Sequence, residues 1–123
     1  MGYSDCFEKN SKLIQNTFFK VAQAMGQWCT QTTQGCDFII STGDNIYNKG
    51  VDSSTDAHFA DTWLDVYDYP GISDLDWYLT VGNHDHYVPG GEWYQVEYSQ
   101  YNSRWIMPSL AYSFQVAAMV GKV

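Results

Sequence analysis

Two short apolar runs constrain the fold of this chain most, because each passes directly into glycine and polar residues. The first run, DFIIS (residues 37–41), precedes TGDN, and the second, DWYLTV (residues 76–81), precedes GNHDH. Runs of this length, rich in β-forming residues and bounded by glycine, are typical of strands buried on both faces. In open α/β sheets, ligands bind beyond the carboxyl ends of such strands. We therefore expect the two polar clusters to lie close together at one edge of a sheet.

Helical patterns alternate with the expected strands. Apolar residues recur at three- and four-residue steps over residues 11–28 and again over 56–67, which predicts two amphipathic helices. A short helix is expected over 92–102, and the alternation over 110–116 predicts a half-buried strand. This order of elements predicts an α/β fold with helices packed on a sheet.

Length and charge exclude several classes of protein. The 123 residues suit one domain or part of one, and a hydrophobic content of 45% suits a globular protein. A net charge of −8, with only six Lys and Arg residues, argues against a nucleic-acid partner. No apolar run approaches the roughly 20 residues of a membrane span. Residues 1–10 lack the layout of a signal peptide. We expect neither a nucleic-acid nor a membrane partner.

The three cysteines, Cys6, Cys29 and Cys36, leave at least one thiol unpaired within the chain. Their spacing matches neither a zinc ribbon nor a C-x-x-C redox pair. Cys29 and Cys36 close a short loop if the compartment is oxidising, and otherwise are two buried thiols. The sequence leaves both alternatives open.

Four polar residues in a row, Asn83, His84, Asp85 and His86, follow the second apolar run. The Asn83 carbonyl oxygen is a hard ligand suited to a divalent cation. His84 suits a metal ligand or a general acid. The sequence assigns no role to Asp85, for which orienting the loop or an imidazole is one option. A turn with incidental imidazoles is the competing interpretation, and the contiguity of the four residues favours a functional site.

Asp44 and Tyr47 follow the first apolar run. A carboxylate at a strand end can give one oxygen to each of two metal ions about 4 Å apart. The alternative for Asp44 is a turn aspartate that bonds its own backbone. Tyr47 is either a phenolate ligand of a Lewis-acidic ion such as ferric iron or a packing residue. His58 lies in a helical pattern, and we expect it to be structural.

Three segments together resemble a known family. FIISTGDNIYNKGV, WYLTVGNHDHY and RWIMPSLAYSF are similar to the tartrate-resistant, purple acid phosphatase group of the calcineurin-like metallophosphoesterases. The resemblance covers about residues 37–116. It implies a layered α/β metallophosphoesterase fold and a dinuclear centre of Fe(III) with Zn, Fe or Mn. It also implies hydrolysis of phosphate monoesters by a metal-bound hydroxide.

The resemblance also implies a role for each matching residue. Asp44 would bridge the two metal ions, Tyr47 would bind the ferric ion, and Asn83 would bind the divalent ion. His84 would protonate the leaving alkoxide or donate to the phosphoryl oxygens. His86 would lie near the substrate. A secreted or lysosome- or vacuole-like location is implied as well.

The chain departs from the family pattern at both ends of the motif series. It has no first strand ending in a GDxG aspartate. It also has no later GHxH pair, because its only histidines are His58, His84 and His86. We therefore expect residues 1–123 to form a single, partial metallophosphoesterase domain belonging to a longer phosphatase. The alternatives are a non-catalytic remnant that acts by association, or a phosphodiesterase of the same superfamily. An unpaired sheet edge in such a partial fold predicts self-association.

Overall fold

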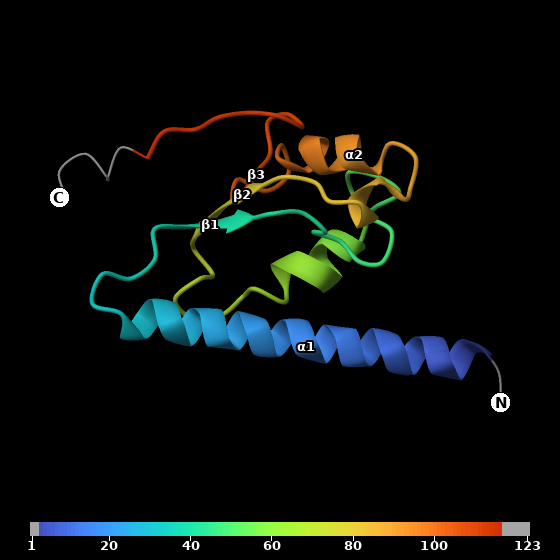
Figure 1. Ribbon diagram of the computed structural model, residues 1–123, viewed down its shortest axis with the longest axis horizontal. Helices are drawn as coiled ribbons and strands as arrows, with labels where there is room; N and C mark the ends of the chain where they lie inside the picture. The colour runs from blue at the N-terminus through green and yellow to red at the C-terminus, as the bar shows by residue number, and fades with distance from the viewer. Residues whose placement is uncertain (1–2, 117–123) are drawn as a thin grey trace.

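The computed structural model describes residues 3–116, and the side chains of residues 12–116. Its centre is a parallel sheet of three strands (Figure 1). β1 (Phe38–Ser41) pairs with β2 (Asp76–Leu79), which in turn pairs with β3 (Trp105–Ile106), so β2 is central. The predicted α/β class is confirmed, and so are the first two predicted strands.

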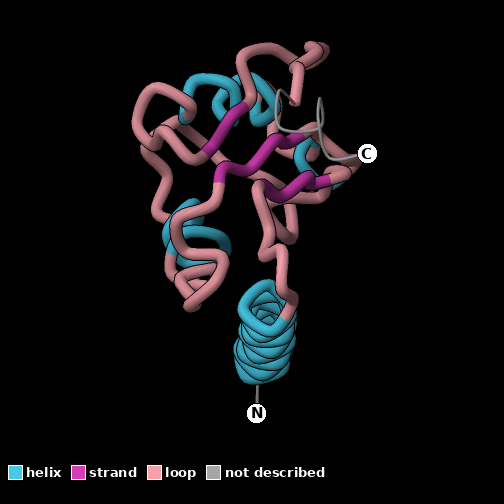
Figure 2. Tube along the Cα trace, turned by 90° about the vertical axis from the view of Figure 1, so that its left-hand side faces the viewer, coloured by secondary structure: helices cyan, strands magenta, loops and turns pink. Residues whose placement is uncertain are grey.

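Two α-helices lie on opposite sides of this sheet. α1 (Tyr3–Gln31) runs along one side and extends beyond the strands, whereas α2 (Gly91–Tyr98) lies on the other side (Figures 1 and 2). The expected start of the first helix near residue 11 is wrong, because the helix already begins at Tyr3. Residues 3–10 contain neither proline nor glycine, so no strong helix breaker stands there. The expected short helix over 92–102 is confirmed as α2, although it ends earlier.

The predicted helix over 56–67 is reduced to a short helical turn. Its centre is the π-helix η1 (Ala60–Leu64), which closes with the Asp65 N–H donating to the Ala60 carbonyl at 2.9 Å. The predicted apolar face is nevertheless confirmed. Phe59, Trp63 and Val66 are each at most 2% exposed. Packing of these side chains, rather than a long helix, therefore accounts for the periodicity.

The predicted third strand is wrong in position. Residues 110–116 form no strand, and β3 lies earlier in the chain. The alternation over 110–116 instead reflects two aromatic contacts with the sheet. The Tyr112 hydroxyl oxygen lies 2.9 Å from the carbonyl oxygens of both Leu79 and Ile106, which share its one proton, and the Phe114 ring stacks on Tyr78 with centroids 3.8 Å apart.

The core is built mainly from aromatic rings. Trp105 of β3 is 1% exposed and meets the rings of Phe59 and Trp63 edge-on, at 5.4 and 5.0 Å between centroids. Phe59 stacks on Tyr98 of α2 at 3.8 Å. The Trp105 indole N–H donates to the Gln95 carbonyl at 2.9 Å. This core therefore ties η1, α2 and β3 together beside the central strand.

β1 is only partly covered, which corrects the expectation that both apolar runs are buried on both faces. Ile39 packs against core side chains, but Ile40 is 59% exposed. Of the α1 side chains, Leu13 and Trp28 are 66% and 69% exposed. α1 therefore covers the sheet with part of its apolar surface only.

A disulfide joins the end of α1 to the segment before β1. Cys29 and Cys36 are linked with Cα atoms 5.1 Å apart, so the first of the two alternatives left open by the sequence holds. Cys6 lies in α1, and its side chain is outside the described part of the chain. Within residues 3–116, no helix is long and apolar enough to cross a membrane.

Candidate metal and phosphate site

The loops that follow β1 and β2 are held together by one buried carboxylate. Asp85 is 0% exposed and lies in the 3-10 helix η2 (His84–His86). Its Oδ1 accepts from the backbone N–H groups of Asn45 and Ile46 at 3.0 and 3.1 Å. Its Oδ2 accepts from Gly82 N–H at 2.8 Å and from Asn45 N–H at 3.1 Å. The carboxylate thus bonds both loops at once.

Asp85 also accepts a hydrogen bond from a side chain of α2. The Gln95 side-chain amide donates to Asp85 Oδ1 at 2.8 Å, and Gln95 is itself 0% exposed. Asn45 Nδ2 donates to Gln95 Oε1 at 3.1 Å and to the Thr80 carbonyl at 2.7 Å. A buried charge is costly unless it is fully hydrogen-bonded, and this network supplies the partners. Of the two options for Asp85, these contacts match the orientation of the loop.

Two glycines allow the loops to approach each other. Gly43 has φ +108°, and a Cβ on it would lie 2.6 Å from the Gly82 nitrogen. A Cβ on Gly82 would in turn overlap the side chain and backbone of Asp44. Only glycine fits such a close approach of two backbones. The glycines noticed after each apolar run therefore serve the contact between the loops.

Asp44 adopts a left-handed backbone conformation at this contact, with φ +53°. Its Oδ1 accepts from the His84 backbone N–H at 3.0 Å, and its Oδ2 accepts from the Tyr47 hydroxyl at 3.2 Å. Non-glycine residues with positive φ are uncommon, and such strain collects at functional sites. The structure thus brings Asp44, Tyr47 and His84 together, as the position of their motifs at strand ends predicts.

The Tyr47 hydroxyl is in an environment that disfavours its ionisation. Burial, followed by the hydrogen bond and charge of Asp44 and by the charge of Asp85, raises the pKa of Tyr47 above its ordinary value of 10.0. A phenolate at this position therefore needs a nearby cation. Two ligand oxygens at right angles and about 2.1 Å from a metal ion lie about 3 Å apart. The 3.2 Å between the Tyr47 and Asp44 oxygens fits that spacing.

His84 is fixed by one ring nitrogen. Its Nδ1–H donates to the Asn48 carbonyl at 2.6 Å, which leaves Nε2 for a ligand. Its ring contacts those of Tyr47 and Tyr87, with centroids 4.9 and 4.8 Å away. His84 is therefore restrained in tautomer and orientation.

Asn83 and His86 lie farther out than the other predicted site residues. Asn83 is exposed, and its amide donates to the Tyr87 hydroxyl at 3.0 Å, so its Oδ1 remains for a cation. His86 is also exposed, and its Nδ1 lies 3.4 Å from a carboxylate oxygen of Glu92 in α2. A role of His86 in substrate binding remains a prediction.

The donors present fit part of a metal centre. Within the described residues, no group of three or more His, Cys, Asp and Glu side chains is arranged to hold a metal ion. Asp44, Tyr47 and Asn83 supply oxygen ligands of the kind that hard cations prefer. Three such ligands are too few to fill the coordination spheres of two metal ions. A dinuclear centre would therefore need ligands beyond those that residues 3–116 bring together.

A cavity of about 830 Å³ adjoins this site. α1 forms one wall, and the polypeptide around Asn48 and His58 forms others. His84 and Tyr47 also line the cavity, so the site opens into it. A volume of this size accommodates a small organic ligand.

The chain belongs to the calcineurin-like phosphoesterase family, whose sequence profile matches residues 4–121. It is similar to tartrate-resistant acid phosphatase type 5 of Sus scrofa, with 38% identity over 97 residues, and of Homo sapiens, with 41% over 103 residues. It also resembles purple acid phosphatase 17 of Arabidopsis thaliana, with 34% identity over 70 residues. These matches cover 79%, 80% and 57% of this chain, but only 28%, 31% and 20% of the respective relatives.

Sequence reasoning missed the buried amide of Gln95 and the position of His58 beside the cavity. Gln95 lies inside an expected helix, where a single buried amide leaves no trace in the apolar pattern. The side chain of His58 is 52% exposed and lines the cavity. The expectation that His58 is structural stays a prediction. The sequence offered one signal for His58, namely Asp56 two residues earlier. That spacing allows a carboxylate to hold both the backbone and the ring of a histidine.

Proposed function

We propose that this chain contributes part of the active site of a metal-dependent acid phosphatase that hydrolyses phosphate monoesters. One observation carries the proposal. The Asp44 carboxylate, the Tyr47 hydroxyl and the His84 imidazole meet where β1 and β2 end, beside a cavity. Similarity to tartrate-resistant and purple acid phosphatases supports the same reaction class.

Asp44, Tyr47 and Asn83 are the residues that would hold metal ions, of which Fe(III) with Zn, Fe or Mn suits the donor set. Bound ions would supply the positive charge that activates water and offsets charge on the phosphoryl group. Asp44 has two oxygens for this task, and a cation would take the place of the hydroxyl proton that now lies between Tyr47 and Asp44. The chain matches less than a third of the length of its phosphatase relatives, so further ligands would come from outside the matched region.

His84 would act on the leaving group. With Nδ1–H held by the Asn48 carbonyl, only Nε2 is free to carry a proton toward the substrate. Protonated, Nε2–H would donate to a phosphoryl oxygen or pass its proton to the departing alkoxide oxygen. His86 lies on the same 3-10 helix and would be near the substrate, at the rim of the site.

The wider setting forms part of the same proposal. The ligand would be a phosphate monoester, and the net charge of −8 disfavours nucleic acid. The Cys29–Cys36 disulfide favours an oxidising compartment, such as a secreted or lysosome- or vacuole-like location. Exposed apolar side chains on α1 and on the edge strand β1 would favour self-association, which sedimentation velocity would detect as a dimer or larger species.

Ferric-ion binding tests the metal ligands independently of turnover. We expect the chain titrated with Fe(III) to develop a visible tyrosinate charge-transfer band. Tyr47→Phe should abolish the band and Asp44→Asn should weaken binding. Tyr101→Phe, at a tyrosine that is 63% exposed, is the matched control and should leave the band unchanged. A band that persists in Tyr47→Phe would contradict the assignment of this ligand.

Hydrolysis of an aryl phosphate at about pH 5, with iron and zinc supplied, tests the reaction. We expect any turnover to be lost in Asp44→Ala and His84→Ala. Turnover that persists in both variants would contradict the proposed roles. A folded, metal-loaded chain without turnover would favour the alternative of a non-catalytic segment that acts by association.

A further inference from the structure

One wall of the cavity is a continuous row of rings. Phe18 of α1 lies 5.8 Å from Tyr47, Tyr47 lies 4.9 Å from His84, and His84 lies 4.8 Å from Tyr87, all between ring centroids. All four side chains line the cavity. A planar organic group can stack on such a wall, and stacked rings gain attraction beyond simple burial. The row begins on α1 and passes through the site itself.

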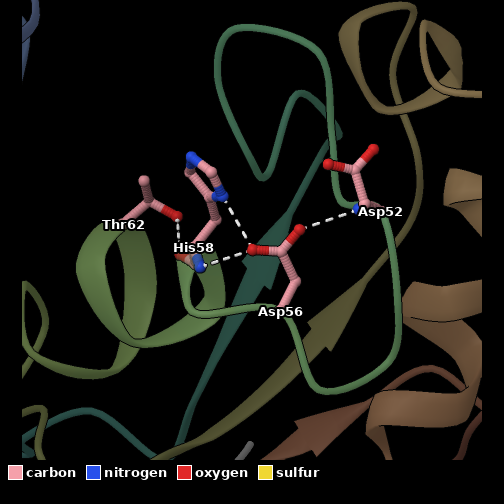
Figure 3. Close-up of polar contacts among 4 residues, drawn as sticks. All are labelled: Asp52, Asp56, His58 and Thr62. Carbon is pink, nitrogen blue, oxygen red and sulfur yellow. Dashed lines mark hydrogen bonds and ion pairs between the residues drawn. The ribbon is translucent and has the colours of Figure 1, made fainter.

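His58 lines the same cavity and is held by Asp56 (Figure 3). Asp56 Oδ1 accepts from the His58 ring Nδ1–H at 2.7 Å and from the His58 backbone N–H at 2.9 Å. Asp56 is fixed in turn, because its Oδ2 accepts from the Asp52 backbone N–H at 2.8 Å. Figure 3 shows the second ring nitrogen of His58 on the side away from Asp56.

This arrangement leaves one functional atom of His58 unused. Since Nδ1 is bonded to Asp56, Nε2 is the atom that can meet a ligand. It accepts a hydrogen bond when the imidazole is neutral and donates one when it is protonated. The His58 side chain is 52% exposed, whereas that of Asp56 is 11% exposed, so the carboxylate is the support and the imidazole is the accessible group.

The charges that line the cavity also suit a phosphate ester. Lys49 and Asp61 are the charged lining residues, and the cavity is also lined by the imidazoles of His58 and His84. The chain as a whole carries fourteen Asp and Glu residues against six Lys and Arg. One lysine against one aspartate leaves the lining of this cavity without the acidic excess of the chain as a whole, which lowers the repulsion of an anionic ligand.

We propose that this cavity holds the organic part of the phosphate ester and that His58, held by Asp56, is the hydrogen-bonding residue that positions it. The inference rests on the proposed function, because it takes the phosphoryl group to lie at Asp44 and His84. His58 is a positioning residue in this scheme. The ester's planar organic group would lie along the ring wall between Phe18 and Tyr87.

NMR titrations of the histidine rings in the full chain, with zinc present, test this assignment. The two probes are inorganic phosphate and phenylphosphonate, which differ by the organic group. We expect phosphate to perturb the ring signals of His84, and those of His86 if it lies near the substrate, and to leave those of His58 unchanged. Phenylphosphonate should perturb the ring signals of both His84 and His58. Direct observation of each ring reports ligand contact, which a merely structural histidine would not show.

Variants of His58 test its contribution to affinity. Losing one hydrogen bond should weaken phenylphosphonate binding to His58→Ala by about three- to tenfold. Phosphate binding should change by less than about twofold. His58→Gln keeps a hydrogen-bonding group and should recover part of the loss. Asp52→Asn is the matched control, because only the Asp52 backbone contacts Asp56.

The outcomes separate this inference from the proposed function. Perturbation of His84 by both probes, with His58 unaffected, would overturn the cavity assignment and leave the function standing. Perturbation of the His58 ring signals by phenylphosphonate, with those of His84 unchanged by both probes, would support binding of the organic group in the cavity and contradict the proposed function. Silence at both rings would overturn both.

Discussion

Substituting Asp85 by asparagine tests whether one carboxylate holds the site together. The two oxygens of Asp85 accept from the backbone N–H groups of Gly82, Asn45 and Ile46 and from the Gln95 amide. All of these partners are donors. The side-chain amide of the Asp85→Asn variant would therefore turn an NH₂ group toward other N–H groups, whichever way that amide is oriented.

The size of the effect follows from the hydrogen bonds lost. If the new NH₂ replaces Oδ2, Gly82 N–H loses its acceptor, whereas Asn45 N–H keeps Oδ1 at 3.0 Å. If the NH₂ replaces Oδ1, Ile46 N–H and the Gln95 amide both lose their acceptor. Hydrogen bonds to a charged group contribute about 1.5–3 kcal/mol each, so the loss is about 1.5–3 kcal/mol in the first orientation and about 3–6 kcal/mol in the second. A chain of this length has a total stability of about 6–18 kcal/mol. We therefore expect Asp85→Asn to lose a large fraction of its free energy of unfolding.

Urea unfolding followed by tryptophan fluorescence measures this loss. Asp74→Asn, at an exposed aspartate, removes the same charge without touching the loops and is the matched control. We expect the midpoint to fall strongly for Asp85→Asn and to change little for Asp74→Asn. A free energy of unfolding for Asp85→Asn within about 1 kcal/mol of the control would refute the view that these contacts hold the loops together.

Three further predictions concern Gly82, the Cys29–Cys36 disulfide and Asp56. Gly82→Ala places a Cβ against Asp44, so it should cost about 1–3 kcal/mol of unfolding free energy in the same urea assay. Reduction of the Cys29–Cys36 disulfide, at a separation of 7 residues, should cost about 2 kcal/mol, measured with and without reductant. Burial raises the pKa of Asp56, but hydrogen bonds from Asp52 and His58 outweigh it and lower the pKa below 3.8 overall. Its stabilisation should therefore be complete above that value and disappear as the pH falls through the lowered pKa, so wild type and Asp56→Ala should converge in acid melts.

The first two strands were predictable because their signal is local. Each is a short apolar run that ends at a glycine, and β1 and β2 lie where those runs lie. The third strand was not, because β3 is only two residues long and carries no alternation. Residues 110–116 do alternate, but there the Tyr112 hydroxyl, rather than a backbone ladder, bonds the carbonyls of Leu79 and Ile106. A period of two thus reports which side chains face the sheet and not whether the backbone pairs.

For the helices as well, apolar periodicity does not determine where the backbone structure begins and ends. Apolar periodicity located the buried face of α1 only in part, because Phe18 and Met25 pack against core side chains whereas Val21 and Trp28 are 45% and 69% exposed. It did not locate the start of α1, since helix geometry continues through polar residues when no breaker intervenes. Over 56–67 the buried face was correct and the helix was too long. Both errors arise because periodicity reports burial, whereas helix ends depend on backbone hydrogen bonds that the sequence pattern does not encode.

The difference between Asp44 and Asp85 shows what the motifs could not supply. Both carboxylates follow a glycine turn at the end of a strand, and residue chemistry alone makes either a metal ligand. Asp85 accepts five hydrogen-bond contacts from N–H groups that must stay protonated, so a cation could bind it only by breaking the contact between the loops. Asp44 has one oxygen on the His84 N–H and the other on a Tyr47 hydroxyl, whose proton a cation can replace. The pairing of β1 with β2 decides which N–H groups each carboxylate meets, and it thereby makes Asp85 the support and leaves Asp44 as the candidate ligand.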